Sequence, residues 1–411
     1  VSAQLAAITP SALNPEELTL IDPASGSGHI LVEAYDLFKA IYLERGYRQR
    51  DVAKLILEKN LFGLDIDERA AQLTGFALMM KGRADDRQIF ERGVKLNVMA
   101  LVDSSGFDAE GLAKAVELGD YGLNLGDLTA LKRLFEHATT FGALIQVPEG
   151  LAKRLPALNK LSEATSADLF VSDALRCLGP LVQQAEMLVA QYDAVVANPP
   201  YMGAKAFTRQ LKDWLRTAYR GNDKDLFAAF IARMLTLTKQ FGYSGVMTSF
   251  VWMFIASFQQ LRRKIVEEQT INSLVQLHYD AFADAKAHVC TFILQNVRIK
   301  GKKSSFIRLS DFPGVENQGP KTLQAIREKD CGWFFVASQD EFARIPGSPI
   351  AYWIRNAKPF DGPRIGNEFV SGGRTKTHGN EQFVRLWWEL DIASQDWAPY
   401  AMGGEFRKYS G

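Results

Sequence analysis

The stretch Tyr192-Asp193-Ala194-Val195-Val196-Ala197-Asn198-Pro199-Pro200-Tyr201 decides the fold. Its first six residues predict a short buried strand, and the two prolines end it because proline lacks the amide hydrogen that a sheet ladder needs. The strand therefore delivers Asn198 and Tyr201 to the carboxyl edge of a sheet, where open α/β sheets bind ligands. Asn198 offers a carbonyl acceptor, and Tyr201 offers a flat ring for stacking. This pair suits an exocyclic amine on a heteroaromatic ring. An ordinary turn with a stray aromatic residue is the alternative.

The composition is that of an ordinary globular protein. The chain has 411 residues, of which 47% are apolar and 23% charged, and its net charge is +1. Two or three domains are expected at this length, and any nucleic-acid surface must be a local patch. The three cysteines are far apart and fit neither a disulfide framework nor a zinc site, which favours the cytoplasm. We expect neither a membrane span nor a signal peptide. Because the chain starts at Val1 and stops at Gly411 without obvious ends, we expect a fragment.

A glycine-rich turn follows the first predicted strand, residues 18–21. It reads Asp22-Pro23-Ala24-Ser25-Gly26-Ser27-Gly28, and from Ile30 onward the apolar residues recur with the period of a helix. Glycines let the backbone approach a ligand, and the helix N-terminus presents unpaired amides. A phosphate site is disfavoured because the P-loop spacing and the third glycine of the dinucleotide motif are missing. Asp22 would also repel a pyrophosphate, whereas it suits a cationic amino group such as that of S-adenosylmethionine.

Acidic residues follow the next two predicted strands. Asp65 and Ile66 end the strand over 61–67, where a carboxylate can accept the hydroxyls of a ribose. Asp65 could instead cap the helix that begins near Glu68, but Asp67 fits that cap better. Either Asp103, directly after a strand over 94–102, or Asp127, which could cap a helix from Leu128, could contact the adenine of a cofactor. Asp103 has the better topological position.

The alternation of strands and helices from 18 to 297 predicts a doubly wound, mostly parallel α/β sheet with an antiparallel strand at its end. Residues 129–191 form a helical insertion. After Tyr201, a stretch mixes cations with aromatic rings: Lys205, Phe207, Arg209, Lys212, Trp214, Arg216, Tyr219, Arg220 and Lys224. It suits a phosphate backbone and splayed bases, or forms a solvated amphipathic helix. A change in composition near 301 predicts one domain over 1–300, followed by a linker and a second domain over 301–411.

Three features taken together closely resemble the amino-methylating DNA methyltransferases of the adenine-N6 type: the Asp-Pro loop at 22–28, the acid at Asp65 and Asn-Pro-Pro-Tyr at 198–201. Further stretches narrow the resemblance to PglX-type adenine methyltransferases of BREX phage-defence systems. They are 196–203, Trp252-Met253-Phe254-Ile255, Leu386-Trp387-Trp388-Glu389 and Gly403-Gly404-Glu405-Phe406-Arg407-Lys408. Members of the family more often have Cys where Ser25 stands. PglX-type proteins are much longer, so an N-terminal region and most of a target-recognition region are expected to be missing here.

The resemblance implies an S-adenosylmethionine-dependent methyltransferase domain over 1–300 and the beginning of a target-recognition domain over 301–411. It implies cofactor binding by Asp22, Pro23, Ala24, Ser25, Gly26, Gly28, Asp65, Ile66, Asp103 and Asp127. The implied catalytic residues are Asn198, Pro199, Pro200 and Tyr201. Double-stranded DNA and other proteins of a phage-defence system are the implied partners. A base inside a duplex must be flipped out to reach such a site.

Other functions remain open at this point. The acceptor could be cytosine N4, an RNA adenine or a glutamine side chain, although the Trp-rich C-terminal extension argues against glutamine. A non-catalytic defence component that binds cofactor and DNA and recruits partners is a further alternative. The sequence shows no metal-nuclease cluster of Asp, Glu and Lys, so it does not support DNA cleavage.

Overall fold

The apolar side chains of the central strands alternate between two separate cores. The computed structural model describes residues 13–283, 286–354 and 362. In β1 (Leu20–Asp22), Ile21 packs in one core and Leu20 in the other. In β4 (Tyr192–Ala197), Val195 and Val196 divide in the same way. Because successive side chains of a strand point to opposite faces, both faces of the sheet are covered.

The sheet of the described residues has the strand order β3-β2-β1-β4-β5-β7-β6-β8-β9. The remaining strands are β2 (Leu61–Asp65), β3 (Asn97–Ala100), β5 (Thr238–Ser249), β6 (Thr270–Gln276), β7 (Val289–Gln295), β8 (Lys303–Arg308) and β9 (Phe334–Ser338). Strands β1 to β5 pair in parallel, and β7 is antiparallel to both of its neighbours. The predicted doubly wound, mostly parallel sheet is confirmed.

Two details of the sheet differ from a simple reading of the sequence. The antiparallel strand β7 was expected at the end of the sheet, but it lies between β5 and β6 because it pairs along both of them. The sheet then continues through β8 and β9, past the change in composition near residue 301, and β9 closes it in antiparallel orientation. Strand β5 begins at Thr238, which pairs with Tyr192, and a bulge follows this pair in the register between β4 and β5.

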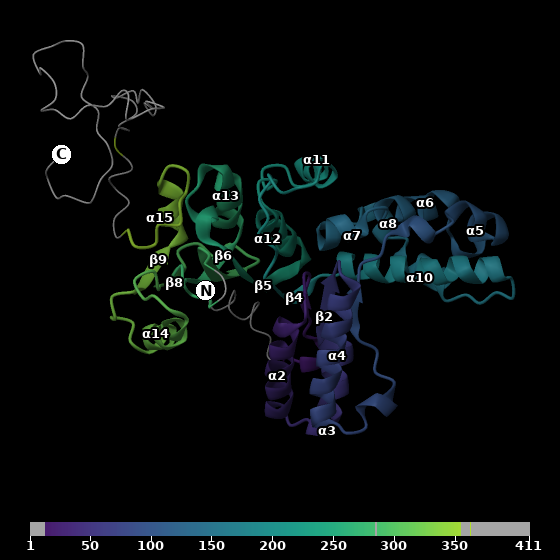
Figure 1. Cartoon of the computed structure of the whole chain (residues 1–411), viewed down its shortest axis with the longest axis horizontal. Helices are drawn as coiled ribbons and strands as arrows, with labels where there is room; N and C mark the ends of the chain where they lie inside the picture. Colours follow the sequence, from purple (N-terminus) through teal and green to yellow (C-terminus); the bar gives the residue numbers. More distant parts are fainter. Residues whose placement is uncertain (1–12, 284–285, 355–361, 363–411) are drawn as a thin grey trace, which may run out of the picture. The chain divides into compact units, whose positions relative to one another are not determined.

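Helices cover the two faces unequally (Figure 1). One face carries α2 (His29–Glu44), α3 (Gln49–Leu55) and α4 (Glu68–Asp85). The other face packs against α10 (Leu169–Val189) and α12 (Leu226–Leu237). The other helices longer than one turn near the C-terminal strands are α13 (Gln259–Glu268), α14 (Val315–Arg327) and α15 (Gln339–Arg344). No helix in the described ranges has the length and apolarity needed to cross a bilayer.

The helical insertion forms a block of its own beside β2 and β4 (Figure 1), and it begins before the predicted 129–191 because its first helix starts at Ala109. It contains α5 (Ala109–Ala115), α6 (Leu125–Leu134), α7 (Ala138–Phe141), α8 (Glu149–Ala152), α9 (Leu155–Ser162) and α10, which leads back to β4. Its apolar side chains share a core with the sheet. The insertion therefore has a fixed packing against the strand ends.

The order of strands along the chain reverses between β1 and β4. Strands β2 and β3 extend the sheet on one side of β1, while β4 and β5 extend it on the other. Such a switch point leaves a crevice outside the carboxyl ends of the strands, where doubly wound folds bind ligands. Asp22 ends β1 and Asn198 directly follows β4, so both lie at this crevice.

Candidate active site

The loop between β1 and α2 is held by backbone contacts that require glycine. Gly28 has a φ of 85°, and a Cβ there would lie 2.8 Å from the side chain of Thr74. The Thr74 hydroxyl donates a hydrogen bond of 2.9 Å to the carbonyl of Gly26, whose φ is 52°. Only glycine adopts these conformations at low cost. The loop therefore lies directly against α4, with its peptide groups at the crevice.

Asp22 lies beneath this loop rather than on its surface. Its side chain is 1% exposed and accepts a 3.0 Å hydrogen bond from the amide of Ala24. Burial raises the pKa of Asp22 to about 7; the Ala24 amide opposes this and the Asp65 carboxylate adds to it. Since burial disfavours the charged carboxylate, a cationic group brought close to it would restore the ionised form.

Asp65 supports the same loop from the end of β2. Its Oδ2 accepts a 2.8 Å hydrogen bond from the amide of Gly26, and its Oδ1 accepts one of 2.9 Å from the amide of Asp67. Asp67 caps α4 by accepting from the amide of Arg69, which confirms the predicted cap. Asp65 therefore does not cap α4. Each of its oxygens keeps a lone pair for a ligand.

The Asn-Pro-Pro-Tyr segment leaves β4 at the same edge. Asn198 is exposed, Pro199 is buried and Pro200 is exposed. The Tyr201 hydroxyl donates a hydrogen bond of 2.9 Å to Oδ1 of Asn198, and the side chain of Tyr201 is 42% exposed. Burial raises the pKa of Tyr201 to about 12, so its phenol keeps its proton near neutral pH. The Oδ1 atom of Asn198 therefore already accepts one hydrogen bond and keeps one lone pair.

These strand ends border one pocket of about 330 Å³. It is lined by Pro23, Ala24, Asp65, Ile66, Thr140, Phe141, Gly142, Ala143, Leu144, Asn198, Pro200, Leu226 and Phe230. Residues from three separate predicted motifs thus meet at one cavity. The others of those motifs, Asp22, Ser25, Gly26, Gly28, Pro199 and Tyr201, are their neighbours along the chain.

Ser25 carries an unsatisfied polar group beside the pocket. Its amide donates a 2.9 Å hydrogen bond to the carbonyl of Leu64, which fixes the residue between β1 and β2. Its hydroxyl is buried and has no partner among the described residues. A buried hydroxyl without a partner is costly, and such atoms occur where a ligand or water completes the site.

The wall facing the strand ends comes from the insertion, and reading the sequence missed it. It consists of 140–144, from the end of α7 and the short 3-10 helix Gly142–Leu144. Asp103 anchors it: the carboxylate accepts hydrogen bonds of 2.8 and 2.9 Å from the amide and hydroxyl of Thr139. Asp103 is therefore placed to position this wall and does not itself line the pocket.

Two buried side chains hold the other end of this wall. Arg233, which is 4% exposed, donates through Nε to the Ala143 carbonyl at 2.9 Å and through Nη2 to the Leu188 carbonyl at 2.7 Å. Burial lowers the pKa of Arg233, but a guanidinium remains charged in proteins. The Tyr219 hydroxyl donates to the Leu144 carbonyl at 2.6 Å. Helices α10 and α12 and the segment after α11 (Arg209–Ala218) thus fix the pocket wall together.

Asp127 has a different role from the one considered for it. It forms a capping box with Asn124 at the start of α6, and its carboxylate lies 3.6 Å from Nε of Arg154. It is absent from the pocket lining. The structure thus brings Asp65 and Ile66 to the pocket and leaves Asp127 within the insertion.

Position 142 of the wall has a backbone conformation that requires glycine. Its φ of 59° and ψ of −149° are accessible to essentially no residue but glycine, and a Cβ would lie 3.0 Å from Cγ2 of Ile66. The dipeptide Phe141-Gly142 was the available signal, but a lone glycine in a loop indicates only a turn.

Replacing Gly142 by alanine is expected to lower both stability and ligand affinity. The strained backbone costs about 1–3 kcal/mol, and the added methyl pushes Ile66 into the pocket. Thermal unfolding and calorimetric titration with S-adenosylmethionine measure the two effects. Gly150→Ala is the control, because Gly150 lies on α8 with open space at its Cβ. Equal behaviour of the two variants would contradict the role of Gly142.

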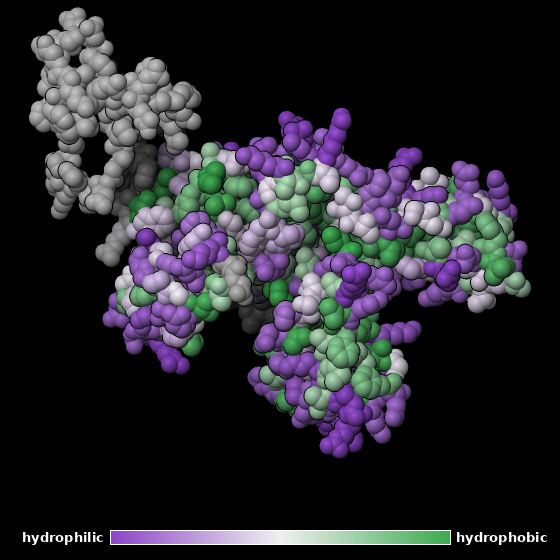
Figure 2. All heavy atoms as spheres, viewed as in Figure 1, coloured by the Kyte–Doolittle hydropathy of each residue, from purple (hydrophilic) through white to green (hydrophobic). Residues whose placement is uncertain are grey.

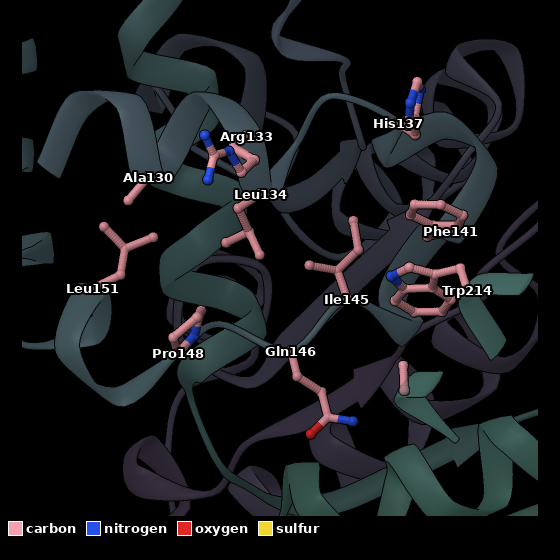
Figure 3. A pocket seen from close by; sticks show the side chains of 11 residues that line it. Ala130, Arg133, Leu134, His137, Phe141, Ile145, Gln146, Pro148, Leu151 and Trp214 are labelled. Atoms are coloured by element: carbon pink, nitrogen blue, oxygen red, sulfur yellow. The ribbon is translucent and has the colours of Figure 1, made fainter. Parts of the chain in front are cut away.

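A second cavity of about 720 Å³ lies behind the wall, between the insertion and α11 (Arg209–Ala218). Figure 3 shows the rings of Phe141 and Trp214 side by side at its border. Their centroids lie 4.2 Å apart and their planes differ by 8°. Phe141 lines both cavities. The ring pair thus joins the pocket wall to the helix that follows the Asn-Pro-Pro-Tyr segment.

Comparison with known proteins identifies the family to which the chain belongs. Residues 59–282, more than half of the chain, match the Eco57I restriction-modification methylases. The chain belongs to this family. The matched range contains Asp65, the insertion and the Asn-Pro-Pro-Tyr segment, so the predicted family resemblance is confirmed.

Individual relatives of the chain include adenine-specific methyltransferases. It is 39% identical to the adenine-specific methyltransferase BrxX of Escherichia coli O9:H4 (strain HS), over 100% of this chain and 36% of that protein. It is 32% identical to the adenine-specific methyltransferase PglX of Lacticaseibacillus casei (strain Zhang), over 96% of this chain and 35% of the relative. The chain thus spans about a third of the length of these relatives. Among solved structures, the type I restriction-modification methyltransferase subunit from Streptococcus thermophilus is similar, with a TM-score of 0.43 and 14% identity, over 82% of this chain and 53% of that one.

Proposed function

We propose that this member of the Eco57I methylase family is the catalytic part of a DNA methyltransferase that acts on adenine N6 in BREX-type phage defence or restriction-modification. One observation carries the proposal: Asn198, at the carboxyl end of β4, borders the same pocket as Asp65 and the glycine-rich loop. The adenine-specific relatives support the choice of adenine. The proposed reaction takes place on DNA in the cytoplasm.

We propose S-adenosylmethionine as the cofactor, and the pocket residues fit it. Asp65 offers two carboxylate oxygens for ribose hydroxyls, and the buried Ser25 hydroxyl awaits a polar partner. Asp22 lies beneath the loop where its charge can favour a cationic amino group. The cofactor supplies an activated methyl group when bound. Asp103 would act on it indirectly, through the wall at 140–144.

Asn198 and the Pro199 carbonyl would activate the substrate amine. The lone pair of an adenine amine is delocalised into the ring, which makes it a poor nucleophile. Two acceptors on its two hydrogens favour a tetrahedral nitrogen with an available lone pair, and holding the amine in this orientation lowers the barrier. Tyr201, being 42% exposed, can turn from Asn198 to stack on a flipped base. The turn frees Oδ1 of Asn198 at the same time.

Product analysis tests the proposed function. The full-length protein is incubated with duplex DNA and methyl-labelled S-adenosylmethionine, and the DNA is digested to nucleosides. Label in N6-methyladenine supports the proposal, whereas label in N4-methylcytosine replaces it with the cytosine alternative. Parallel reactions with RNA or with a protein substrate cover the other two acceptors, and label in one of these but not in DNA replaces the proposal with that alternative. Long-read methylation mapping of cellular DNA with and without the protein then gives the recognised site.

The remaining alternative is a defence scaffold in which methylation is secondary. Phage defence that persists in cells carrying Asn198→Ala would favour it over catalysis. The division into a methyltransferase domain over 1–300 and the start of a target-recognition domain over 301–411 remains a prediction. The stretches 372–377 and 403–408 contain Arg and Lys residues that suit contacts to phosphates or base edges. Both stretches lie outside the described residues.

The ring of Tyr201, rather than its hydroxyl, is expected to matter for transfer. Tyr201→Phe keeps the stacking face and removes the hydrogen bond to Asn198, so its rate should stay within about threefold of the natural protein. Tyr201→Ala should lose about 10- to 100-fold, since stacking on a base contributes about 1–3 kcal/mol. Single-turnover methyl transfer measures both. If Tyr201→Phe were as slow as Tyr201→Ala, the hydroxyl would be the functional group.

A further inference from the structure

A cluster of cations lies beside the proposed active site and outside the pocket. Arg216, Arg220, Lys224 and Arg263 line one open cleft of about 700 Å³, with Asp223 as its one acidic residue. All four cations are exposed, whereas the side chain of Asp223 is 11% exposed. The chain as a whole is almost neutral, with a net charge of +1. This cleft, which we name the basic cleft, is thus a local concentration of positive charge.

The basic cleft joins two segments that are far apart in the sequence. Arg216 and Arg220 come from the end of α11 and the loop after it, and Arg263 comes from α13. The segments touch closely, because Gly221 has a φ of 86° and a Cβ there would overlap Oε1 of Gln260 at 1.7 Å. The helix α11 is itself amphipathic, as the sequence allowed, because Leu211 and Leu215 are buried while Arg216 is exposed. Figure 2 shows hydrophilic side chains gathered over α11.

Hydrogen bonds connect the cleft to the residues that follow Tyr201. The amide of Ala204 donates to the carbonyl of Lys224 at 3.0 Å, and the amide of Leu226 donates to the carbonyl of Met202 at 3.0 Å. Gly203 forms a β-bridge with Asp225 between them. The backbone after Tyr201 and the loop that carries the cations thus form one hydrogen-bonded unit. A partner held in the cleft is held in register with Asn198 and Tyr201.

The ion pairs within the cleft leave its cations available. Arg216 lies 3.6 Å from Asp213, Lys224 lies 3.2 Å from Asp223, and Arg263 lies 3.2 Å from Glu267. The pairs of Arg216 and Arg263 are exposed on both sides, and such pairs contribute about 0–1 kcal/mol and exchange readily for another anion. Arg220 forms no ion pair with any residue that the structure describes. Guanidinium groups bind phosphate oxygens in a bidentate manner.

We infer that the basic cleft binds the phosphodiester backbone of the DNA strand next to the flipped base and so positions that base at Asn198. The inference rests on the proposed function and adds a positioning surface to it. Contacts to phosphates fix the register of a protein on DNA without reading its sequence. The cleft would therefore contribute affinity for any duplex, and specificity would come from elsewhere in the full-length protein.

The test measures how DNA affinity depends on salt. Arg220→Ala, Arg263→Ala and the double variant of the full-length protein are titrated with a fluorescent duplex between about 50 and 200 mM salt. Each lost phosphate contact should flatten the plot of log affinity against log salt by about 1. Arg263→Lys should restore most of the slope. Arg87→Ala is the matched control, because Arg87 is an exposed arginine that directly follows the helix α4 and lies outside the cleft.

A second readout separates this inference from the proposed function. The variants should raise KM for DNA while kcat and the affinity for S-adenosylmethionine stay unchanged. The role of the cleft is overturned if the double variant keeps the natural slope of log affinity against log salt. It is also overturned if the natural protein does not bind the duplex. The variants can show the expected slope change even if the natural protein binds duplex DNA and transfers no methyl group. In that case the proposed function fails, while the cleft remains a DNA-binding surface.

Discussion

Asn198→Ala is expected to abolish methyl transfer while cofactor affinity remains near that of the natural protein. The side chain lies at the pocket border, and its Oδ1 accepts a hydrogen bond from Tyr201 in this structure. Removing a positioned hydrogen-bonding group at a reacting centre typically costs about 10²–10³-fold in rate. The backbone at 198 is unchanged by the substitution, and Asp65 and Ser25 lie on other strands. Single-turnover transfer to duplex DNA and calorimetric binding of S-adenosylmethionine give the two quantities.

A matched amide elsewhere controls for this substitution. Asn317 lies in the helix α14 and donates to the carbonyl of Pro313, and neither residue lines the pocket. Asn317→Ala should transfer methyl groups at the natural rate. Transfer by Asn198→Ala at that same rate would show that the Asn198 side chain takes no part in the reaction. It would contradict the proposal that Asn198 and the Pro199 carbonyl activate the amine together. Loss of cofactor binding in Asn198→Ala would instead show that the side chain shapes the pocket.

The features at strand ends could be predicted because local chemistry fixes them. Two prolines end β4 because proline has no amide hydrogen for the sheet ladder. A glycine turn followed by a helix with an apolar face leaves few choices of backbone conformation. The end of a parallel strand then determines where its side chains lie in space. Asp22, Asp65 and Asn198 could thus be placed at one sheet edge from the amino-acid sequence alone. The burial of Asp22 and the position of Asp65 and Asn198 at the pocket could not be predicted in this way. They depend on where the amides of Ala24 and Asp67 lie in the folded chain.

The pocket wall could not be predicted because it is built by long-range contacts. Thr139 is held by Asp103, and Ala143 is held by Arg233, which is 90 residues further along the chain. Nothing near 140–144 signals these partners, since each contact forms only after the insertion packs on the sheet. The position of β7 is a similar case, because a strand of alternating residues fits an edge or an interior place equally well until its neighbours are known.

Asp22→Asn is expected to keep its unfolding free energy as the pH rises from 5 to 8, where the natural protein loses stability. The variant is also expected to bind the cofactor more weakly. The pKa of Asp22 is about 7 in the folded state, against an ordinary value of 3.8. Because the folded-state pKa is raised, this carboxyl contributes stability that is full below about pH 4 and is lost as the pH rises through 7. Relative to Asp22→Asn, the natural protein should lose about 2–3 kcal/mol of unfolding free energy between pH 5 and pH 8. Denaturant unfolding at several pH values measures the difference.

The cofactor should reverse this penalty in the natural protein alone. If a cationic amino group approaches Asp22, the ionised carboxylate gains a partner, so stabilisation by S-adenosylmethionine should grow from pH 6 to pH 8. The neutral amide of Asp22→Asn gains nothing from that charge, and its stabilisation should not depend on pH in this range. Its affinity should be lower by about 10- to 100-fold, since a hydrogen bond to a charged group contributes about 1.5–3 kcal/mol. Comparing the two proteins at each pH cancels the constant cost of burying the amide. Parallel pH profiles for both proteins would mean that Asp22 only supports the loop, whereas diverging profiles would mean that the fold keeps a costly buried acid for its ligand.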